Sequence, residues 1–175
     1  DVETLTSTSV TNNSTVAGTP PTLLSSSPVD DATSITTSSN IVLTFSEAVA
    51  KGTGNIIIYK SSDDSAVETF DVASSTLVKG NGTNTITINP TSDLAEQTSY
   101  YIQIASTAFD DLYGNSYVGI TDKTTYNFTT ADETAPTLSS TSSTSIAENT
   151  TSVHTYTTDE TVTWSLNGGD DSALF

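Results

Sequence analysis

Side chains that could bind a cation fall in two loops of the sequence, 47–55 and 110–122. If the chain folds as a Greek-key β-sandwich and 66–79 count as one strand, both loops lie at the end where the chain enters, so their acids and amides converge there. Oxygen ligands in this number suit Ca²⁺, which takes about six to eight oxygens. We therefore predict a calcium site at this end, formed by Glu47, Asp110, Asp111 and Asn115.

An acidic pair, Asp132 and Glu133, shortly precedes Pro136 and is placed to bind calcium towards a downstream domain. The alternative for all six residues is that they are solvated loop residues, selected for turn geometry rather than for metal. Residues 110–114 (DDLYG) do not form an EF-hand loop, because the alternating ligands and the terminal Glu are missing. Residues 17–20 contain no acid, so the two junctions differ in chemistry.

Catalytic chemistry finds little support in the sequence. The single histidine, His154, lies in a stretch rich in Ser and Thr, and the chain has no Cys and no nucleophile elbow. Trp164 is expected to be the core aromatic residue of its own domain, with stacking on a sugar as the alternative. We therefore predict a protein that is not an enzyme.

The charge of the chain disfavours several classes of partner. It carries 21 acidic residues against four Lys and no Arg, which gives a formal net charge of −17. Such a chain repels phosphate backbones and anionic lipid headgroups, so nucleic acid and direct membrane insertion are not expected. Divalent cations are the natural partners instead.

The composition favours an all-β protein with a surface rich in hydroxyl groups. Ser and Thr make up 63 of the 175 residues, and Cys and Met are both absent. Thr favours strands and Ser favours turns, whereas the lack of Cys excludes disulfides and thiolate metal sites. The chain has neither a secretory signal nor a membrane span, as expected of an internal fragment of a longer protein.

Hydrophobic alternation with period 2 predicts strands at regular spacing, and no segment shows helical periodicity. The pattern is clearest at 41–46, where Ile41, Leu43 and Phe45 share one face. Residues 66–79 read as one strand broken by a bulge at 73–75, and 80–83 (GNGT) predict a hairpin turn. Further strands are expected at 55–59, 84–89, 100–104 and 124–129.

Two similar Pro-containing segments, 19–23 (TPPTL) and 134–138 (TAPTL), stand 115 residues apart. The spacing matches one small β-sandwich, so we interpret the segments as one junction used twice in a tandem array; the alternative is coincidence. Residues 1–19 are then a linker or the closing strand of a preceding domain. A complete domain covers 20–131, a linker covers 132–137, and 138–175 begin a second sandwich too short to close a core.

The middle domain resembles the bacterial Ig-like domains named for a surface-layer protein. The matching segments are 27–30 (SPVD), 41–49 (IVLTFSEAV), 54–56 (GNI), Leu94 with Tyr100 and Tyr101, 111–115 (DLYGN) and 128–130 (FTT). The resemblance implies an Ig-like Greek-key β-sandwich of about seven strands. It also implies a secreted protein of the bacterial cell surface.

Residues 138–175 resemble the opening of a cadherin-like bacterial repeat, through 146–149 (IAEN), 164–166 (WSL) and 168–175 (GGDDSALF). Asp159 and Glu160 stand where calcium-binding members carry a spaced Asp pair, which departs from the pattern. Together the resemblances imply a large repetitive adhesin whose repeats are stiffened by calcium.

Three functions follow as expectations. The first is an extender repeat of a bacterial surface adhesin, which projects a distal binding domain and contacts neighbouring domains of the same chain, while other domains bind a surface glycan. The second is a subunit of a surface layer, sheath or filament that assembles laterally with identical subunits. The third, a carbohydrate-binding module, would use Tyr113 and Tyr117 as its aromatic platform.

Overall fold

The computed structural model describes residues 18–140 and 155–164. The chain divides into two units, Asp1–Asp132 and Glu133–Phe175. All ten strands of the described residues lie in the first unit, and none of these residues forms a helix. The strands are β1 (Leu23–Ser27), β2 (Ala32–Ile35), β3 (Ile41–Lys51), β4 (Asn55–Lys60), β5 (Ala66–Asp71), β6 (Val78–Lys79), β7 (Thr83–Ile88), β8 (Ser99–Ile104), β9 (Phe109–Asp111) and β10 (Asn127–Thr130).

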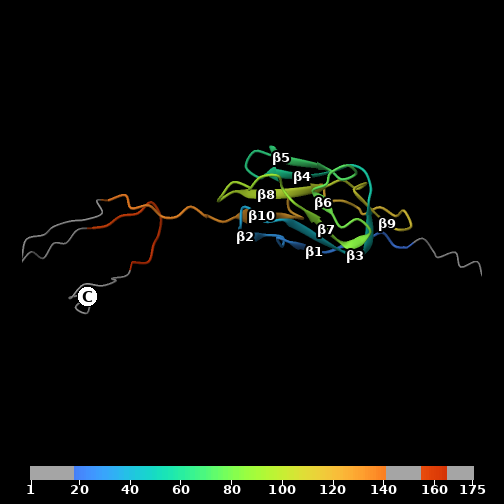
Figure 1. Cartoon of the computed structure of the whole chain (residues 1–175), viewed down its shortest axis with the longest axis horizontal. Helices are drawn as coiled ribbons and strands as arrows, with labels where there is room; N and C mark the ends of the chain where they lie inside the picture. Colours follow the sequence, from blue (N-terminus) through green and yellow to red (C-terminus); the bar gives the residue numbers. More distant parts are fainter. Residues whose placement is uncertain (1–17, 141–154, 165–175) are drawn as a thin grey trace, which may run out of the picture. The chain divides into compact units, whose positions relative to one another are not determined.

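The strands form two five-stranded sheets that pack as a β-sandwich (Figure 1). One sheet has the order β1-β3-β7-β6, with β9 paired to β3, and the other has the order β2-β10-β8-β4-β5. Among the paired strands of the described residues, β2 and β10 are parallel to each other, and all other pairs are antiparallel. The predicted all-β sandwich is therefore confirmed for the first unit. Among the described residues, no helix has the length and apolar character needed to cross a membrane.

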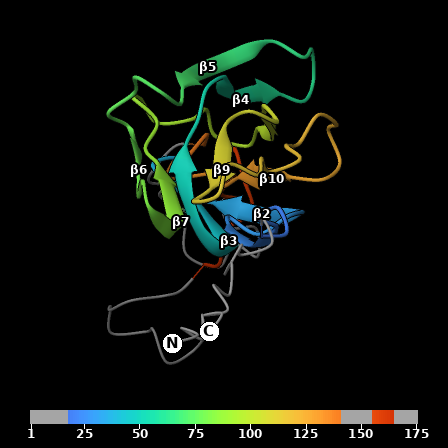
Figure 2. The same cartoon turned by 90° about the vertical axis from the view of Figure 1, so that its right-hand side faces the viewer.

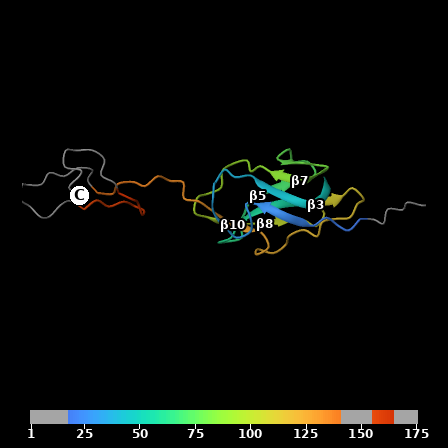
Figure 3. The same ribbon diagram turned by 90° about the horizontal axis from the view of Figure 1, so that it is seen from below.

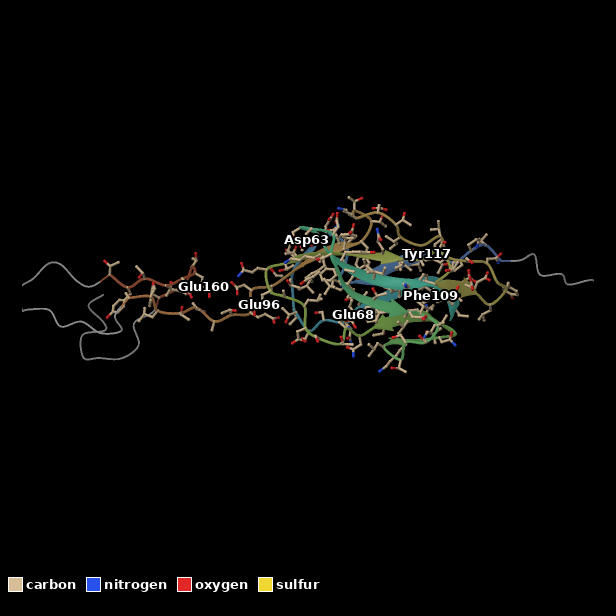
Figure 4. The ribbon with its side chains drawn as sticks, turned by 90° about the horizontal axis from the view of Figure 1, so that it is seen from above. Asp63, Glu68, Glu96, Phe109, Tyr117 and Glu160 are labelled. Atoms are coloured by element: carbon tan, nitrogen blue, oxygen red, sulfur yellow. The ribbon has the colours of Figure 1, made fainter. Side chains whose placement is uncertain are left out.

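The core follows directly from the alternation in the sequence. Ile41, Leu43 and Phe45 of β3 are fully buried, as are Ile56 and Ile58 of β4 in the opposite sheet. Burying a side chain of this size contributes about 1.5–3 kcal/mol. The aromatic end of the core is formed by Phe109 and Tyr117, labelled in Figure 4, whose ring centroids lie 5.3 and 5.2 Å from that of Phe45.

Strand β3 is longer than predicted, since it continues from the expected end at residue 46 to Lys51. Its pairing with β7 shifts register between Thr44 and Val49, which marks an irregularity rather than the end of the strand. Beyond the shift, Val49–Lys51 pair with β9. Glu47 therefore lies within a strand and not in a loop that leaves it.

The prediction of a single strand over 66–79 is wrong. The segment forms β5 in one sheet and β6 in the other, joined by a turn in which the Asp71 carboxylate accepts hydrogen bonds from the N–H groups of Ala73 and Ser74. Lys51 Nζ supports the crossing by donating to the carbonyl groups of Ser75 (2.8 Å) and Val78 (3.2 Å). Phe70 and Val78 are the buried apolar residues of these two strands, and a buried residue in a strand does not show in the sequence which sheet the strand joins.

The second unit, taken by itself, opens as the first one does. In the first unit Ser46 Oγ accepts from Thr22 N, and Ser46 N donates to Thr22 O. In the second unit Asp159 Oδ1 accepts from Thr137 N, and Asp159 N donates to Thr137 O. Thr137 stands 115 residues after Thr22. That the two segments are one junction used twice stays a prediction.

A second sandwich is not shown. Leu138 and Thr158 form an isolated bridge, and Trp164 is 59% exposed, with its ring 6.0 Å from that of Tyr156. The prediction that Trp164 is a buried core residue is wrong in the described part of this unit, where its side chain is exposed. Most of the residues predicted to be cadherin-like, and His154, lie outside the described residues.

Candidate functional site

The loop after β9 is organised around a buried carboxylate, that of Asp111. Asp111 is only 2% exposed, and its Oδ1 accepts hydrogen bonds from the backbone N–H groups of Tyr113 and Asn115, both at 2.8 Å. Its Oδ2 accepts from Asn115 Nδ2 at 2.7 Å. A buried charge is tolerated only when it is paired in this way. Asp111 therefore fixes the conformation of residues 111–115.

These hydrogen bonds control the ionisation of Asp111. Burial is the largest single effect and raises the pKa of this carboxyl group. The hydrogen bonds from Asn115, Tyr113 and Gly114 act in the opposite direction and together hold the pKa below its usual value. Asp111 is consequently a carboxylate at neutral pH.

Asn115 connects this loop to the incoming chain. Its Nδ2 donates to Gly18 O at 2.7 Å as well as to Asp111 Oδ2. A side chain at position 18 would come within 3.3 Å of Asp111 Oδ2 and 3.6 Å of Tyr113 Cδ2, so Gly18 lies directly against the loop. The predicted convergence of the loop 110–122 with the point where the chain enters is therefore present in the structure.

Asp110 faces away from Asp111, because adjacent residues of a strand point to opposite faces. Its Oδ1 accepts from Ser116 Oγ at 2.6 Å. Its Oδ2 lies 3.1 Å from the position that a Cβ atom would take at Gly52. Glu47 is partly buried within the irregular part of β3. Three of the predicted ligands thus lie close together in sequence, Asp110 and Asp111 at the end of β9 and Asn115 in the loop after it, but the two carboxylates point to opposite sides.

Within residues 18–140 and 155–164, no group of three or more His, Cys, Asp or Glu side chains is placed to hold a metal ion. Asp111 uses both oxygens for N–H donors of its own loop, and the nitrogen of Asn115 rather than its oxygen faces Asp111. This arrangement does not fit a calcium ion at the predicted four residues without a change in the loop. Calcium binding at Glu47, Asp110, Asp111 and Asn115 stays a prediction.

The chain leaves the first unit at the opposite end from Gly18, as both Figure 1 and Figure 3 show. Thr130 at the end of β10 is buried, and its Oγ1 donates to Ala95 O at 2.6 Å. Asp132 is exposed, and its Oδ2 accepts from Gln97 Nε2 at 2.7 Å. Glu133 is exposed and belongs to the second unit.

The predicted aromatic platform for a sugar does not form. Tyr113 is 61% exposed at the tip of the loop, but Tyr117 is only 5% exposed and packs edge-on against Phe45. Because Tyr117 belongs to the core, only Tyr113 is left to stack on a ligand.

Two further polar clusters were not predicted. Asp122 accepts hydrogen bonds from the N–H and hydroxyl groups of both Thr124 and Thr125, and these bonds hold its pKa far below the usual value. Lys123 forms an ion pair with Asp64 (2.5 Å) and lies over the ring of Tyr101. The sequence 122–125 (DKTT) carries a signal for the first cluster, since Asp followed by Thr two and three residues later favours such a turn. No local signal joins Asp64 to Lys123.

Comparison with known families gives one match, in which residues 17–130 fit the family described as bacterial Ig-like domain. No curated protein matches the chain. The matched range contains both sheets of the first unit and the loop that holds Gly18.

Proposed function

The chain belongs to the bacterial Ig-like domain family, and from this we propose that it is a non-enzymatic spacer segment of a secreted bacterial surface protein. Domains of this family are typical of surface proteins and are typically non-catalytic. In the proposed role the segment belongs to an adhesin and projects a distal binding domain away from the cell.

The observation that carries this proposal is the position of the two chain ends of the first unit. The chain enters beside β9, at the end that faces the viewer in Figure 2, and leaves after β10 at the other end. Both points are fastened by hydrogen bonds, through Asn115 at Gly18 and through Gln97 at Asp132. A domain with this arrangement adds its full length to an array.

The edges of the two sheets favour a spacer over a laterally assembled sheath. Edge strands that pair between subunits are typically long and regular. Here β1 and β5 carry register shifts, β2 has four residues and β6 has two. Lateral pairing through such edges is weak, and the net charge of −17 opposes it further.

The spacer role is tested by self-association and by deletion. We expect the purified chain to sediment as a monomer, whereas ordered sheets or tubes would support the sheath instead. In the bacterium, deleting residues 20–131 should reduce adhesion of whole cells and leave ligand binding by the purified distal domain unchanged. Unchanged adhesion would contradict the spacer role.

We propose that calcium stiffens the downstream junction through Asp132 and Glu133, since both carboxylates are exposed beside the linker. Replacing EDTA by millimolar Ca²⁺ should then raise the melting temperature and the solution radius of the chain. The double variant Asp132→Asn/Glu133→Gln should lose both effects, whereas Asp93→Asn, which changes another exposed acid, should keep them. Identical values in Ca²⁺ and EDTA would overturn the calcium part and leave the spacer role intact.

A further inference from the structure

The first strand of the sandwich is poorly protected against a pull on the incoming chain. β1 has five residues, forms one edge of its sheet and pairs only with β3. Its register shifts between Leu23 and Ser25, and Leu24 is mostly exposed. A strand of this kind peels from an edge one hydrogen bond at a time, because no second neighbour holds it.

The incoming chain is fastened at a second place before β1 begins. Gly18 O accepts from Asn115 Nδ2, and the same nitrogen is held by the buried carboxylate of Asp111. We call these three groups, the Gly18 carbonyl, the Asn115 amide and the Asp111 carboxylate, the Gly18 clamp. Asp111 in turn belongs to β9, which pairs with Val49–Lys51 of β3.

The clamp and β1 therefore attach the incoming chain to different parts of the sandwich. β1 is bonded to Val42–Phe45 in the first half of β3, whereas β9 is bonded to the second half, beyond the register shift. Tension on the chain before Gly18 reaches Asn115 and β9 first. It reaches β1 only after the clamp has opened.

We propose that the Gly18 clamp diverts tension from the preceding chain into β9 and β3, and so keeps the edge strand β1 from being peeled off. This inference rests on the proposed spacer function, in which tension passes from one end of the domain to the other. The chemistry of the clamp suits this role, because a hydrogen bond to an amide oriented by a buried carboxylate is already in its bonded geometry.

The test is single-molecule pulling in two directions on the full chain. The chain has no Cys, so introduced thiols give unique attachment points. The pair Asp1→Cys/Ala135→Cys pulls through Gly18, whereas Val29→Cys/Ala135→Cys bypasses both Gly18 and β1. Asn115→Ala removes the bonds to both Gly18 O and Asp111 Oδ2, and only the first of these joins the incoming chain to the loop. At a fixed force, the variant should therefore accelerate opening of the first unit about fivefold more with the first pair than with the second, as expected for the loss of one neutral hydrogen bond. With the second pair, any acceleration measures the lost bond to Asp111 Oδ2, which acts in both directions.

Two further variants test whether the effect comes from the contact at Gly18 and not from a general weakening of the loop. Ser116→Ala removes the hydroxyl group that donates to Asp110 from the same loop, and should leave the rate unchanged in both directions. Gly18→Val places a Cβ 3.3 Å from Asp111 Oδ2 and 3.6 Å from Tyr113 Cδ2, so it presses the incoming chain and the loop apart. It should reproduce the effect of Asn115→Ala even if that variant folds poorly.

Equal acceleration in both directions, or none through Gly18, would overturn the clamp. The spacer role would survive that outcome, since it rests on the position of the chain ends. Conversely, a chain that assembles into sheets would overturn the spacer role without changing these rates.

Discussion

Replacing Tyr126 by Phe should stabilise the first unit, because the tyrosine buries a hydroxyl group that has no hydrogen-bond partner. Tyr126 is 1% exposed, and burial raises its pKa far above the usual value. The Ser26 hydroxyl is near enough to lower this pKa slightly, but it does not lie in hydrogen-bonding geometry. The ring itself is well packed, with its centroid 6.4 Å from that of Phe128.

The size of the effect follows from the cost of the unpaired group. A buried hydroxyl group left without a partner costs about 1–3 kcal/mol, and Phe keeps the ring while removing this cost. We therefore expect Tyr126→Phe to raise the free energy of unfolding by about 1 kcal/mol, since some of the gain is lost where the oxygen leaves a small void. For a domain of this size the melting temperature should rise by about 3–5 °C.

Tyr100 provides the matched control. It is also buried, but its hydroxyl oxygen accepts from Ala95 N at 2.9 Å. Tyr100→Phe leaves that N–H group without its partner and should lower the free energy of unfolding by about 1 kcal/mol. Urea unfolding followed by circular dichroism measures both changes. If Tyr126→Phe destabilises the unit as Tyr100→Phe does, the Tyr126 hydroxyl is paired and the reasoning is refuted; an equal loss in Ser26→Ala would identify the partner.

Acid should destabilise the first unit, because the pKa values of Asp111 and Asp122 are lowered on folding. A carboxyl group whose pKa is lowered on folding stabilises the fold at pH values above its unfolded pKa of about 3.9. This contribution is lost as the pH falls towards the folded pKa, so the free energy of unfolding should decline from about pH 4 downwards. The decline should be less steep in Asp122→Asn. Gly80→Ala should cost more than about 2 kcal/mol, because its Cβ would stand 2.0 Å from Thr85 O at a φ of 101°. Gly82 is also at positive φ, but no atom lies within 4 Å of its Cβ position, so Gly82→Ala should lower the free energy of unfolding by only about 1 kcal/mol. Equal losses of stability in the two variants would show that the backbone conformation, and not the clash with Thr85 O, determines the effect.

The sequence predicted the sandwich because the signals for it are local. Ile41, Leu43 and Phe45 alternate in the chain and are buried together on one face of β3. The crossing between β5 and β6 was missed because it depends on which sheet each strand joins, and a pattern of period 2 is the same in either sheet. Lys51, whose amine supports that crossing, stands 24 residues from Ser75 and gives no signal in the sequence.

The candidate metal site shows a different limit. The expected strand order placed the loop 110–122 beside the incoming chain, where Asn115 meets Gly18, but residue type does not tell which way an oxygen points. One signal was available: Asp110 and Asp111 are adjacent in a strand, so they face opposite sides, and the burial of Phe109 directs Asp111 inward as well.

The same three residue types in a short loop, Asp, Gly and Asn, therefore suit two structures. In a calcium loop the carboxylate and amide oxygens face a common centre. In residues 111–115 the centre is the Asp111 carboxylate itself, and N–H groups of Tyr113 and Asn115 face it. An ion would have to displace these donors, whereas the carboxylate of Asp132 is exposed, and one of its oxygens accepts from the flexible side chain of Gln97. If calcium acts on this protein, we expect it at the point where the chain leaves the sandwich, while hydrogen bonds alone hold the point where the chain enters.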